Sequence, residues 1–284
     1  METFTDFYMQ HKTEFSAVFF DIDGTLIAGN EPLPGAAELL EILQKDRVPY
    51  FLLTNDSCHS QAEKARFMRR AGLIADETNI ISSGNVLKWW AERFYNGGLF
   101  FRFGSLGEPD YAISAGIEVT REAALAPECR GVIMGEGCFD WRQNLETVFN
   151  IFLKHPDYPL IAVNPDTYGS TADGSKMSIS SGGFTRLICS LLEDAGVHIE
   201  PVFLGKPYAS FYQCAYSHIK EQFPALEGLD PRRIMMVGDS LKSDIQGGNS
   251  AGFTTCLVLS GVSSLKAAEE APGAQKPDRI FRSV

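Results

Sequence analysis

Two pairs of aspartates follow apolar runs in this chain, at points where predicted β-strands end. Asp21 and Asp23 come directly after the first run, and Asp239 and Asp244 come after a later one. Mg²⁺ prefers oxygen ligands and uses few protein carboxylates, so that water and a substrate oxygen complete its coordination. Asp21 and Asp239 are therefore candidate ligands of a magnesium ion.

Two further strand ends carry groups that bind phosphate. Lys206 offers an ammonium charge and Thr54 offers a hydroxyl donor. Because a phosphomonoester repels an anionic nucleophile, a carboxylate such as Asp21 attacks it only where cations neutralise the phosphoryl oxygens. Asp23 is placed to protonate the leaving oxygen and then to deprotonate the water that resolves an acyl-phosphate. Together these residues predict phosphoryl chemistry.

Short β-rich runs alternate with helical patterns along almost the whole chain. This alternation predicts an α/β fold, a Rossmann-like parallel sheet with helices on both faces. Ligands of such sheets bind at the carboxyl ends of the strands. The predicted strands are 17–21, 50–54, 80–82, 99–103, 131–134, 160–163, 201–204, 234–237 and 255–258. The predicted helices follow Pro34, open at the capping-box pair Ser60 and Glu63, and lie around 89–90, 145–152 and 187–192.

Composition bounds the class of protein. A chain of 284 residues with 44% hydrophobic residues predicts one large or two modest globular domains. The formal charge of −11 argues against nucleic acid as a partner, but a local metal or lysine still permits a small phosphorylated ligand. We expect no membrane span and no secretory signal. The six cysteines are scattered, which predicts reduced thiols in a cytoplasmic protein.

The motifs resemble those of the haloacid dehalogenase superfamily of phosphohydrolases. The matching residues are Asp21-Ile22-Asp23-Gly24-Thr25, Thr54, Lys206, and Gly238-Asp239 with Asp244. Gly205-Lys206-Pro207 and Asn164-Pro165-Asp166 are similar to class IIA, which includes NagD-type, p-nitrophenyl, phosphoglycolate and pyridoxal phosphatases. The resemblance implies a catalytic core of residues 1–96 and 201–284, with an α/β cap of residues 97–200 inserted between the second and third motifs. The run 201–204 should then return the chain to the sheet of the first strand.

The resemblance also implies a role for each motif residue. Asp21 is the expected nucleophile and Asp23 the expected general acid/base. Asp244 is expected to support the metal ligands or to bind the ion through water. The expected phosphate and substrate binders are Thr54, Asn55 and Lys206, and the expected Mg²⁺ ligands are Asp21, the backbone carbonyl of Asp23, and Asp239.

Three departures from the family pattern leave the substrate open. Asp56 stands where the family usually has asparagine, and an extra carboxylate near an anionic ligand should weaken phosphate binding unless it points away. Val163 replaces a usual threonine, and 180–183 reads Ser-Ser-Gly-Gly instead of a Pro-Gly-rich turn. We expect the loop 165–181 to set specificity. A sugar phosphate, a nucleotide, phosphoglycolate or pyridoxal phosphate is compatible with the motifs.

Other interpretations of the same residues stay open. The aspartyl-phosphate that serves a phosphatase also serves a phosphotransferase with an acceptor other than water. A non-enzymatic sensor of phosphorylated ligands is a third reading, although neither the nucleophile nor the acid is missing. Asp244 alone is also consistent with the first turn of a helix, where carboxylates are favoured. Related enzymes dimerise through the cap, which implies a possible homodimer.

Overall fold

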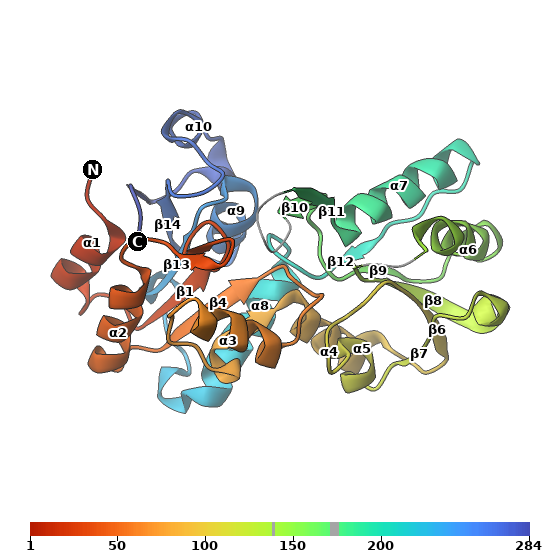
Figure 1. Cartoon of the computed structure of the whole chain (residues 1–284), viewed down its shortest axis with the longest axis horizontal. Coiled ribbons are helices and arrows are strands. Elements are labelled where there is room, and N and C mark those ends of the chain that lie inside the picture. Colours follow the sequence, from red (N-terminus) through yellow and green to blue (C-terminus); the bar gives the residue numbers. More distant parts are fainter. Residues whose placement is uncertain (138–139, 171–175) are drawn as a thin grey trace.

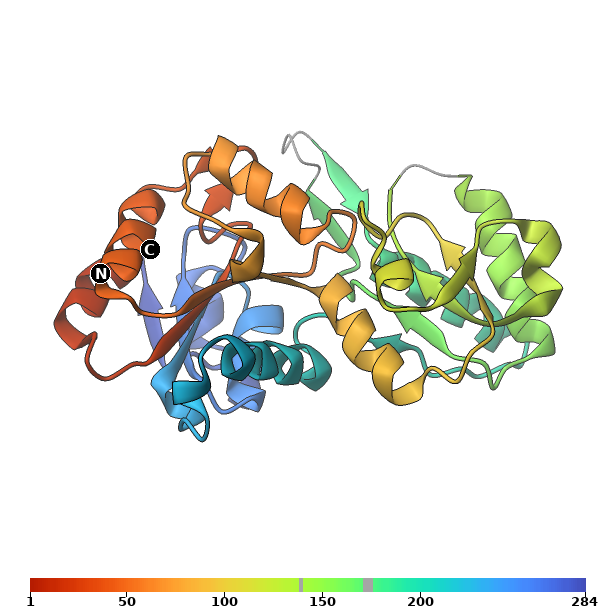
Figure 2. The same ribbon diagram turned by 90° about the horizontal axis from the view of Figure 1, so that it is seen from below.

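The computed structural model describes residues 1–137, 140–170 and 176–284, which form two parallel sheets (Figure 1). The large sheet has the strand order β15-β14-β13-β1-β4-β5, and the small sheet has the order β12-β9-β8-β6-β7. Figures 1 and 2 show the two sheets at opposite ends of an elongated molecule, with both termini beside the large sheet. The parallel α/β fold expected from the sequence is confirmed.

The elements around the large sheet come from both ends of the chain. Its strands are β1 Ala17–Asp21, β4 Tyr50–Thr54, β5 Ile80–Ser82, β13 Ile234–Gly238, β14 Thr254–Val258 and β15 Arg279–Phe281. Its helices are α1 Phe4–His11, α2 Ala36–Asp46, α3 Gln61–Arg70, α4 Ser83–Phe94, α8 Ala209–Gln222, α9 Gln246–Ser250 and α10 Leu265–Glu269. A short hairpin of β2 Ile27–Ala28 and β3 Glu31–Pro32 follows β1.

The elements around the small sheet come from the middle of the chain. Its strands are β6 Leu99–Phe103, β7 Glu118–Thr120, β8 Cys129–Met134, β9 Leu160–Ala162 and β12 Val202–Phe203. Its helices are α5 Tyr111–Ser114, α6 Trp141–Lys154 and α7 Ser181–Asp194. The strands β10 Tyr168–Ser170 and β11 Met177–Ile179 pair as an antiparallel hairpin between β9 and α7.

Alternate residues of β1 enter different hydrophobic clusters, because successive side chains of a strand point to opposite faces. Val18 and Phe20 pack with side chains of α1, α2 and α3, whereas Ala17 and Phe19 pack with those of α4 and α8. The second cluster continues into the small sheet through Phe100, Ile133 and Ile161. The two sheets therefore share a continuous buried surface, which fixes the strand ends of one relative to the loops of the other.

One strand assignment from the sequence is wrong. The run 201–204 was expected in the sheet of the first strand, but β12 pairs with β9 and extends the small sheet. Both of its residues are only half-buried, as befits a two-residue edge strand. Leu204 and Gly205 then carry the chain across to the large sheet, so that Lys206 reaches the site from a loop.

The capping box expected at Ser60 is confirmed. The Ser60 hydroxyl accepts a hydrogen bond from the backbone N–H of Glu63 at 3.3 Å, and the Glu63 carboxylate accepts one from the Ser60 N–H at 2.8 Å. These bonds satisfy two of the free N–H groups at the start of α3 and fix where that helix begins. Within the described ranges, no helix is both long and apolar enough to span a bilayer.

Candidate active site

Three aspartates meet at the carboxyl edge of the large sheet. Asp21 ends β1, and Asp239 and Asp244 follow β13, which pairs with β1 in parallel. One carboxylate oxygen of each lies within 4.8 Å of the others. Neighbouring parallel strands end at the same edge, so this convergence follows directly from the strand order.

Lys206 joins two of these aspartates. Its Nζ lies 2.5 Å from Oδ1 of Asp21 and 2.7 Å from Oδ1 of Asp244, and the whole lysine side chain is buried. Its ammonium also approaches the carbonyl oxygen of Leu53 at 3.4 Å. Lys206, which follows β12 of the small sheet, thus lies at the centre of the aspartate cluster of the large sheet.

The site is crowded with negative charge. Burial raises the pKa of Asp21 well above its usual value, although the Lys206 ammonium opposes the shift. Burial and the nearby Asp244 raise the pKa of Asp239 to about 6. One ammonium faces three clustered carboxylates, and this all-oxygen donor set fits a hard divalent cation such as Mg²⁺.

Backbone groups hold the carboxylates in place. Oδ2 of Asp239 accepts the N–H of Val262 at 2.7 Å, and Oδ2 of Asp244 accepts the N–H of Ser240 at 3.1 Å. Gly24 has a φ of 86°, and a Cβ there would lie 2.5 Å from Oδ2 of Asp239. Glycine at that position therefore permits both the left-handed turn and the close approach of the Asp239 carboxylate.

Asp23 and Thr54 flank the cluster in different settings. The Asp23 side chain is 64% exposed, so its carboxylate is accessible to solvent beside the site. Thr54 is buried, and its hydroxyl accepts the N–H of Asp56 at 3.1 Å. A hydroxyl that accepts one hydrogen bond still has its own hydrogen to donate, which suits a phosphate contact.

The Asn55 side chain holds the backbone of Lys206. Its Oδ1 accepts the Lys206 N–H at 2.7 Å, and its Nδ2 donates to the Lys206 carbonyl oxygen at 3.1 Å. Nδ2 also donates to Oδ2 of Asp166, which follows β9 of the small sheet, at 3.0 Å. The structure therefore gives Asn55 a positioning role, and its contact with substrate stays a prediction.

Replacing Asn55 by alanine is expected to lower kcat/KM by about 10- to 100-fold, a common effect of removing a partner that orients a site residue. The variant loses both bonds that fix the Lys206 backbone, whereas Asp166→Ala loses one bond and should lose less. Steady-state kinetics of the two variants test this, with the exposed Asn150→Ala as the matched control. Wild-type kcat/KM in Asn55→Ala would contradict the positioning role.

Asp56 does not act as the isolated negative charge that its departure from the family pattern suggested. Oδ2 of Asp56 lies 2.5 Å from Nζ of Lys64 and 2.8 Å from Nδ1 of His59. These two groups hold the pKa of Asp56 well below its usual range against the effect of burial. The carboxylate is thus compensated locally. Sequence reasoning missed Lys64, for which the unusual Asp56 was the available signal.

Glu136, also missed, ties the loops of the small sheet together. Its Oε1 accepts the side-chain N–H of Asn164 at 2.7 Å and the backbone N–H of Ser181 at 3.1 Å, and its Oε2 accepts the Cys58 thiol at 3.3 Å. Burial raises the pKa of Glu136. These bonds anchor both ends of the expected specificity loop 165–181, of which 171–175 lie outside the described residues.

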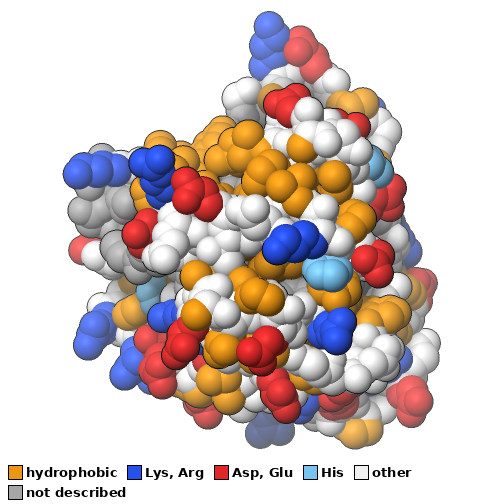
Figure 3. Space-filling model, turned by 90° about the vertical axis from the view of Figure 1, so that its right-hand side faces the viewer, with side chains coloured by type: hydrophobic (Ala, Val, Ile, Leu, Met, Phe, Trp, Pro, Cys, Tyr) orange, Lys and Arg blue, Asp and Glu red, His pale blue; other side chains and the backbone are white. Residues whose placement is uncertain are grey.

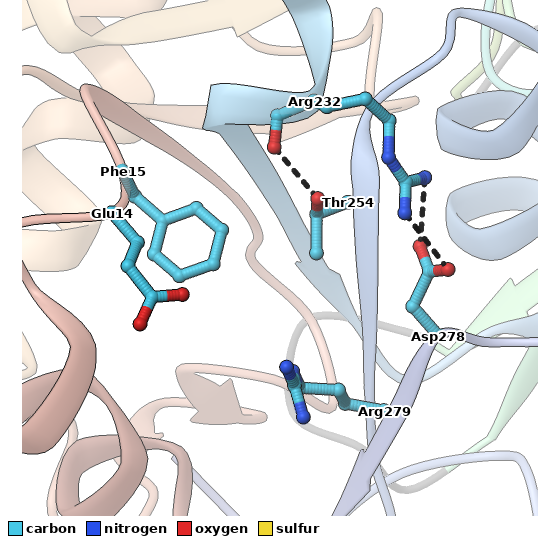
Figure 4. A pocket seen from close by; sticks show the side chains of 6 residues that line it. All are labelled: Glu14, Phe15, Arg232, Thr254, Asp278 and Arg279. Carbon is cyan, nitrogen blue, oxygen red and sulfur yellow. Dashed lines mark hydrogen bonds and ion pairs between the residues drawn. The ribbon is translucent and has the colours of Figure 1, made fainter.

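A cavity of about 360 Å³ lies at the other edge of the large sheet, near the amino-terminal end of β14 (Figure 4). Within it Arg232 forms a two-point ion pair with Asp278, both distances being 3.1 Å. The cavity is lined by Glu14, Phe15, Arg232, Thr254, Asp278 and Arg279. None of these residues belongs to the aspartate–lysine cluster, so the cavity is not part of the candidate site.

Comparison with known proteins assigns the chain to a family. A model of haloacid dehalogenase-like hydrolases matches residues 18–118, and a HAD-hydrolase-like model matches residues 203–284. Chronophin of Mus musculus is 32% identical over 261 residues, covering 89% of this chain and 83% of chronophin. The chain belongs to the haloacid dehalogenase superfamily. It is a class IIA phosphatase within that superfamily.

Two further similarities support the assignment of this haloacid dehalogenase phosphatase. The dihydroxyacetone phosphatase of Corynebacterium glutamicum (strain R) is 27% identical over 243 residues, covering 86% of this chain and 80% of that protein. The structure of NagD from E. coli K-12 superimposes with a TM-score of 0.78 and 26% identity, covering 95% of this chain and 96% of NagD. The resemblance seen in the motifs is confirmed.

Proposed function

We propose that this phosphatase is Mg²⁺-dependent and hydrolyses a small phosphomonoester through an aspartyl-phosphate on Asp21. The observation that carries the proposal is the contact of Lys206 with Asp21 and Asp244, inside a cluster of three carboxylates. The cluster combines a nucleophile, a fixed ammonium and oxygen ligands for a cation. A phosphoryl group brought to this edge meets all three.

In the first step an Oδ atom of Asp21 attacks phosphorus and the bond from phosphorus to the ester oxygen breaks. Asp23 gives a proton to the departing oxygen, which leaves as an alcohol. In the second step Asp23 removes a proton from water, and the water oxygen attacks phosphorus. The aspartyl–phosphate bond breaks, so that inorganic phosphate leaves and the Asp21 carboxylate is restored.

The remaining residues hold the phosphoryl group and the cation. The ion would be held by Asp21, the backbone carbonyl of Asp23, and Asp239. When bound, Mg²⁺ neutralises the phosphoryl oxygens so that an anionic nucleophile can approach. Lys206 supplies a second positive charge and the Thr54 hydroxyl a donor. Asp244 keeps the Lys206 ammonium in place, which we propose as its principal role.

The substrate class that we propose is a small phosphorylated metabolite, such as a sugar phosphate or a nucleotide. The similar protein from Corynebacterium glutamicum is named for dihydroxyacetone, a small alcohol, which supports a compact leaving group. Residues 97–200 would act as the cap, with the loop 165–181 facing the substrate.

Transfer to an acceptor other than water uses the same residues, and product analysis with added alcohols separates it from hydrolysis. The cytoplasmic location stays a prediction.

Release of inorganic phosphate from a panel of phosphomonoesters tests the proposal. We expect turnover with Mg²⁺ for at least one triose, sugar or nucleoside phosphate and for p-nitrophenyl phosphate. Chelation by EDTA should abolish phosphate release and added Mg²⁺ should restore it, because the carboxylate cluster then regains its neutralising charge. Equal turnover of all substrates in EDTA would contradict the proposed metal dependence.

We also propose that the chain forms a homodimer through the small-sheet part. Figure 3 shows hydrophobic side chains gathered on that end of the molecule. Trp141 and Leu187 are 58% and 44% exposed, and both line a largely apolar cavity of about 630 Å³. Burial of such side chains against a second copy is favourable.

Replacing Leu187 by glutamate is therefore expected to convert a dimer into a monomer, because the charge would have to be buried in the contact. Light scattering coupled to size-exclusion chromatography measures the mass. The matched control is Leu265→Glu on α10, an exposed leucine beside the large sheet. A wild-type protein of monomer mass would overturn the dimer proposal.

A further inference from the structure

Lys64 is a buried lysine that has no role in the mechanism proposed above. It lies in the first half of α3, and its side chain is only 10% exposed. Its Nζ lies 2.5 Å from Oδ2 of Asp56 and 4.0 Å from Oδ2 of Asp23. The ammonium therefore stands between the loop that follows β4 and the turn that follows β1.

The burial of this ammonium requires a compensating charge, because removing a charge from water costs several kcal/mol unless it is paired. Asp56 supplies that charge, and it raises the pKa of Lys64 against the effect of burial. His59 completes the group by contacting the same Asp56 oxygen at 2.8 Å. Asp56 and Lys64 thus form one compensated unit, in which neither charge is stable without the other.

The unit places a positive charge next to the residue that handles the proton. Among the ion pairs of the described residues, the one with Lys64 is the only one that involves Asp23. The Asp23 side chain is 64% exposed, and an exposed carboxylate samples several rotamers unless something restrains it. Hydrolysis of an alkyl ester needs this carboxyl group in one position, facing the departing oxygen.

We propose that Lys64 is a positioning residue for Asp23, held in place by Asp56, so that the acid faces the leaving oxygen. This rests on the proposed function, in which Asp23 protonates the leaving group. The aspartate at position 56, which departs from the family pattern, would then hold the Lys64 ammonium that orients Asp23. Phosphate binding by Lys206 and Thr54 does not use the side chains of this unit, because Thr54 contacts only the backbone N–H of Asp56.

The position of Asp23 should matter more for some leaving groups than for others. An alkyl alcohol leaves only when its oxygen is protonated, whereas p-nitrophenolate leaves as an anion without a proton. A misplaced Asp23 therefore slows the first step with alkyl phosphomonoesters and spares that step with p-nitrophenyl phosphate. A purely structural role of Lys64 would lower the rates with both substrates alike.

The experiment compares the double variant Asp56→Asn/Lys64→Met with the wild type. The double variant removes both charges, so it leaves no buried carboxylate unpaired and should remain folded. Its substrates are p-nitrophenyl phosphate and the alkyl phosphomonoester that the wild type turns over fastest. Formation of p-nitrophenolate or alcohol is followed in a single turnover, which isolates the first step. Turnover of both by the wild type shows phosphatase activity before the variants are compared.

We expect the first-step rate of the double variant to fall about 10- to 100-fold with the alkyl substrate, the usual effect of losing an orienting partner, and by less than about 3-fold with p-nitrophenyl phosphate. Lys64→Arg, which keeps the charge, should retain more of the alkyl rate than the double variant. The exposed Lys45→Met is the matched control and should change neither. Equal losses with both substrates, or no loss with either, would overturn the proposal.

Discussion

Replacing Asp21 by asparagine is expected to lower kcat on the order of 10⁴-fold or more with every phosphomonoester, even at saturating Mg²⁺. Loss of a catalytic nucleophile has effects of this size in other hydrolases, since no neighbouring group takes over the attack. Asparagine keeps the shape of the side chain. Its Oδ1 can still accept from Lys206, and its Nδ2 can donate to the Thr25 hydroxyl, which in the wild type donates to Asp21 at 3.3 Å. The loss is therefore chemical and not structural.

Initial-rate measurements on this variant need two checks. Thermal unfolding should give a midpoint at or above that of the wild type, because burial of the Asp21 charge costs free energy. The exposed Asp157→Asn in the middle of the chain is the matched control and should keep the wild-type kcat. An Asp21→Asn enzyme with more than about a tenth of the wild-type kcat would remove Asp21 from the role of nucleophile.

Replacing Lys206 by methionine is expected to damage both activity and stability. The variant loses the ammonium that we propose to contact the phosphoryl oxygens, and we expect kcat/KM to fall by about 10³-fold. It also strands Asp21 and Asp244 as buried carboxylates without their cation, which typically costs about 3–5 kcal/mol of unfolding free energy. Urea unfolding in EDTA measures the second effect apart from catalysis.

The stability loss should depend on pH in a defined direction. The pKa of Asp21 is already raised by burial in the wild type, and removing the Lys206 ammonium raises it further. An acid whose pKa is higher in the folded state loses stability as pH rises through the interval between its unfolded and folded pKa values. The deficit of Lys206→Met relative to the wild type should therefore be largest near pH 7.5 and shrink toward pH 4.

A second variant separates charge from packing. Adding Asp244→Asn to Lys206→Met removes one stranded carboxylate, so it should restore part of the stability and none of the activity. If the double variant is no more stable than Lys206→Met, then charge stranding is not the cause. If Lys206→Met keeps wild-type kcat/KM, the lysine does not bind the phosphoryl group.

The sequence predicted the convergence of the site because every motif except one follows a strand of the same parallel sheet. Once β1, β4 and β13 are neighbours, Asp21, Thr54 and Asp239 must share one edge. Lys206 lies against Asp21 although its strand was assigned to the wrong sheet, since β12 belongs to the small sheet. A two-residue strand carries too little pattern to reveal which sheet it joins.

Contacts between distant side chains were beyond the reach of sequence reasoning. Nothing in the order of residues shows that the Asn55 side chain binds the backbone of Lys206. Nor does it show that Asp166, which follows a strand of the small sheet, accepts a hydrogen bond from Asn55. The contact of Asp56 with Lys64 depends on how α3 packs relative to the loop that follows β4. Strand β15 was also missed, because its three residues carry too little pattern. Helix α1 was missed although Phe4, Phe7 and Tyr8 lie at helical spacing after a capping box of Thr3 and Asp6.

The most direct test of the account is to identify the phosphorylated residue. Borohydride reduces an acyl-phosphate of aspartate to homoserine, so the modified position can be read by peptide mass spectrometry. The Asp23→Asn variant with p-nitrophenyl phosphate and Mg²⁺ should accumulate the intermediate, because the first step then needs no proton and the second has no base. We predict homoserine at position 21. An unmodified Asp21 in enzyme that has released p-nitrophenolate, or homoserine at another aspartate, would contradict the central claim.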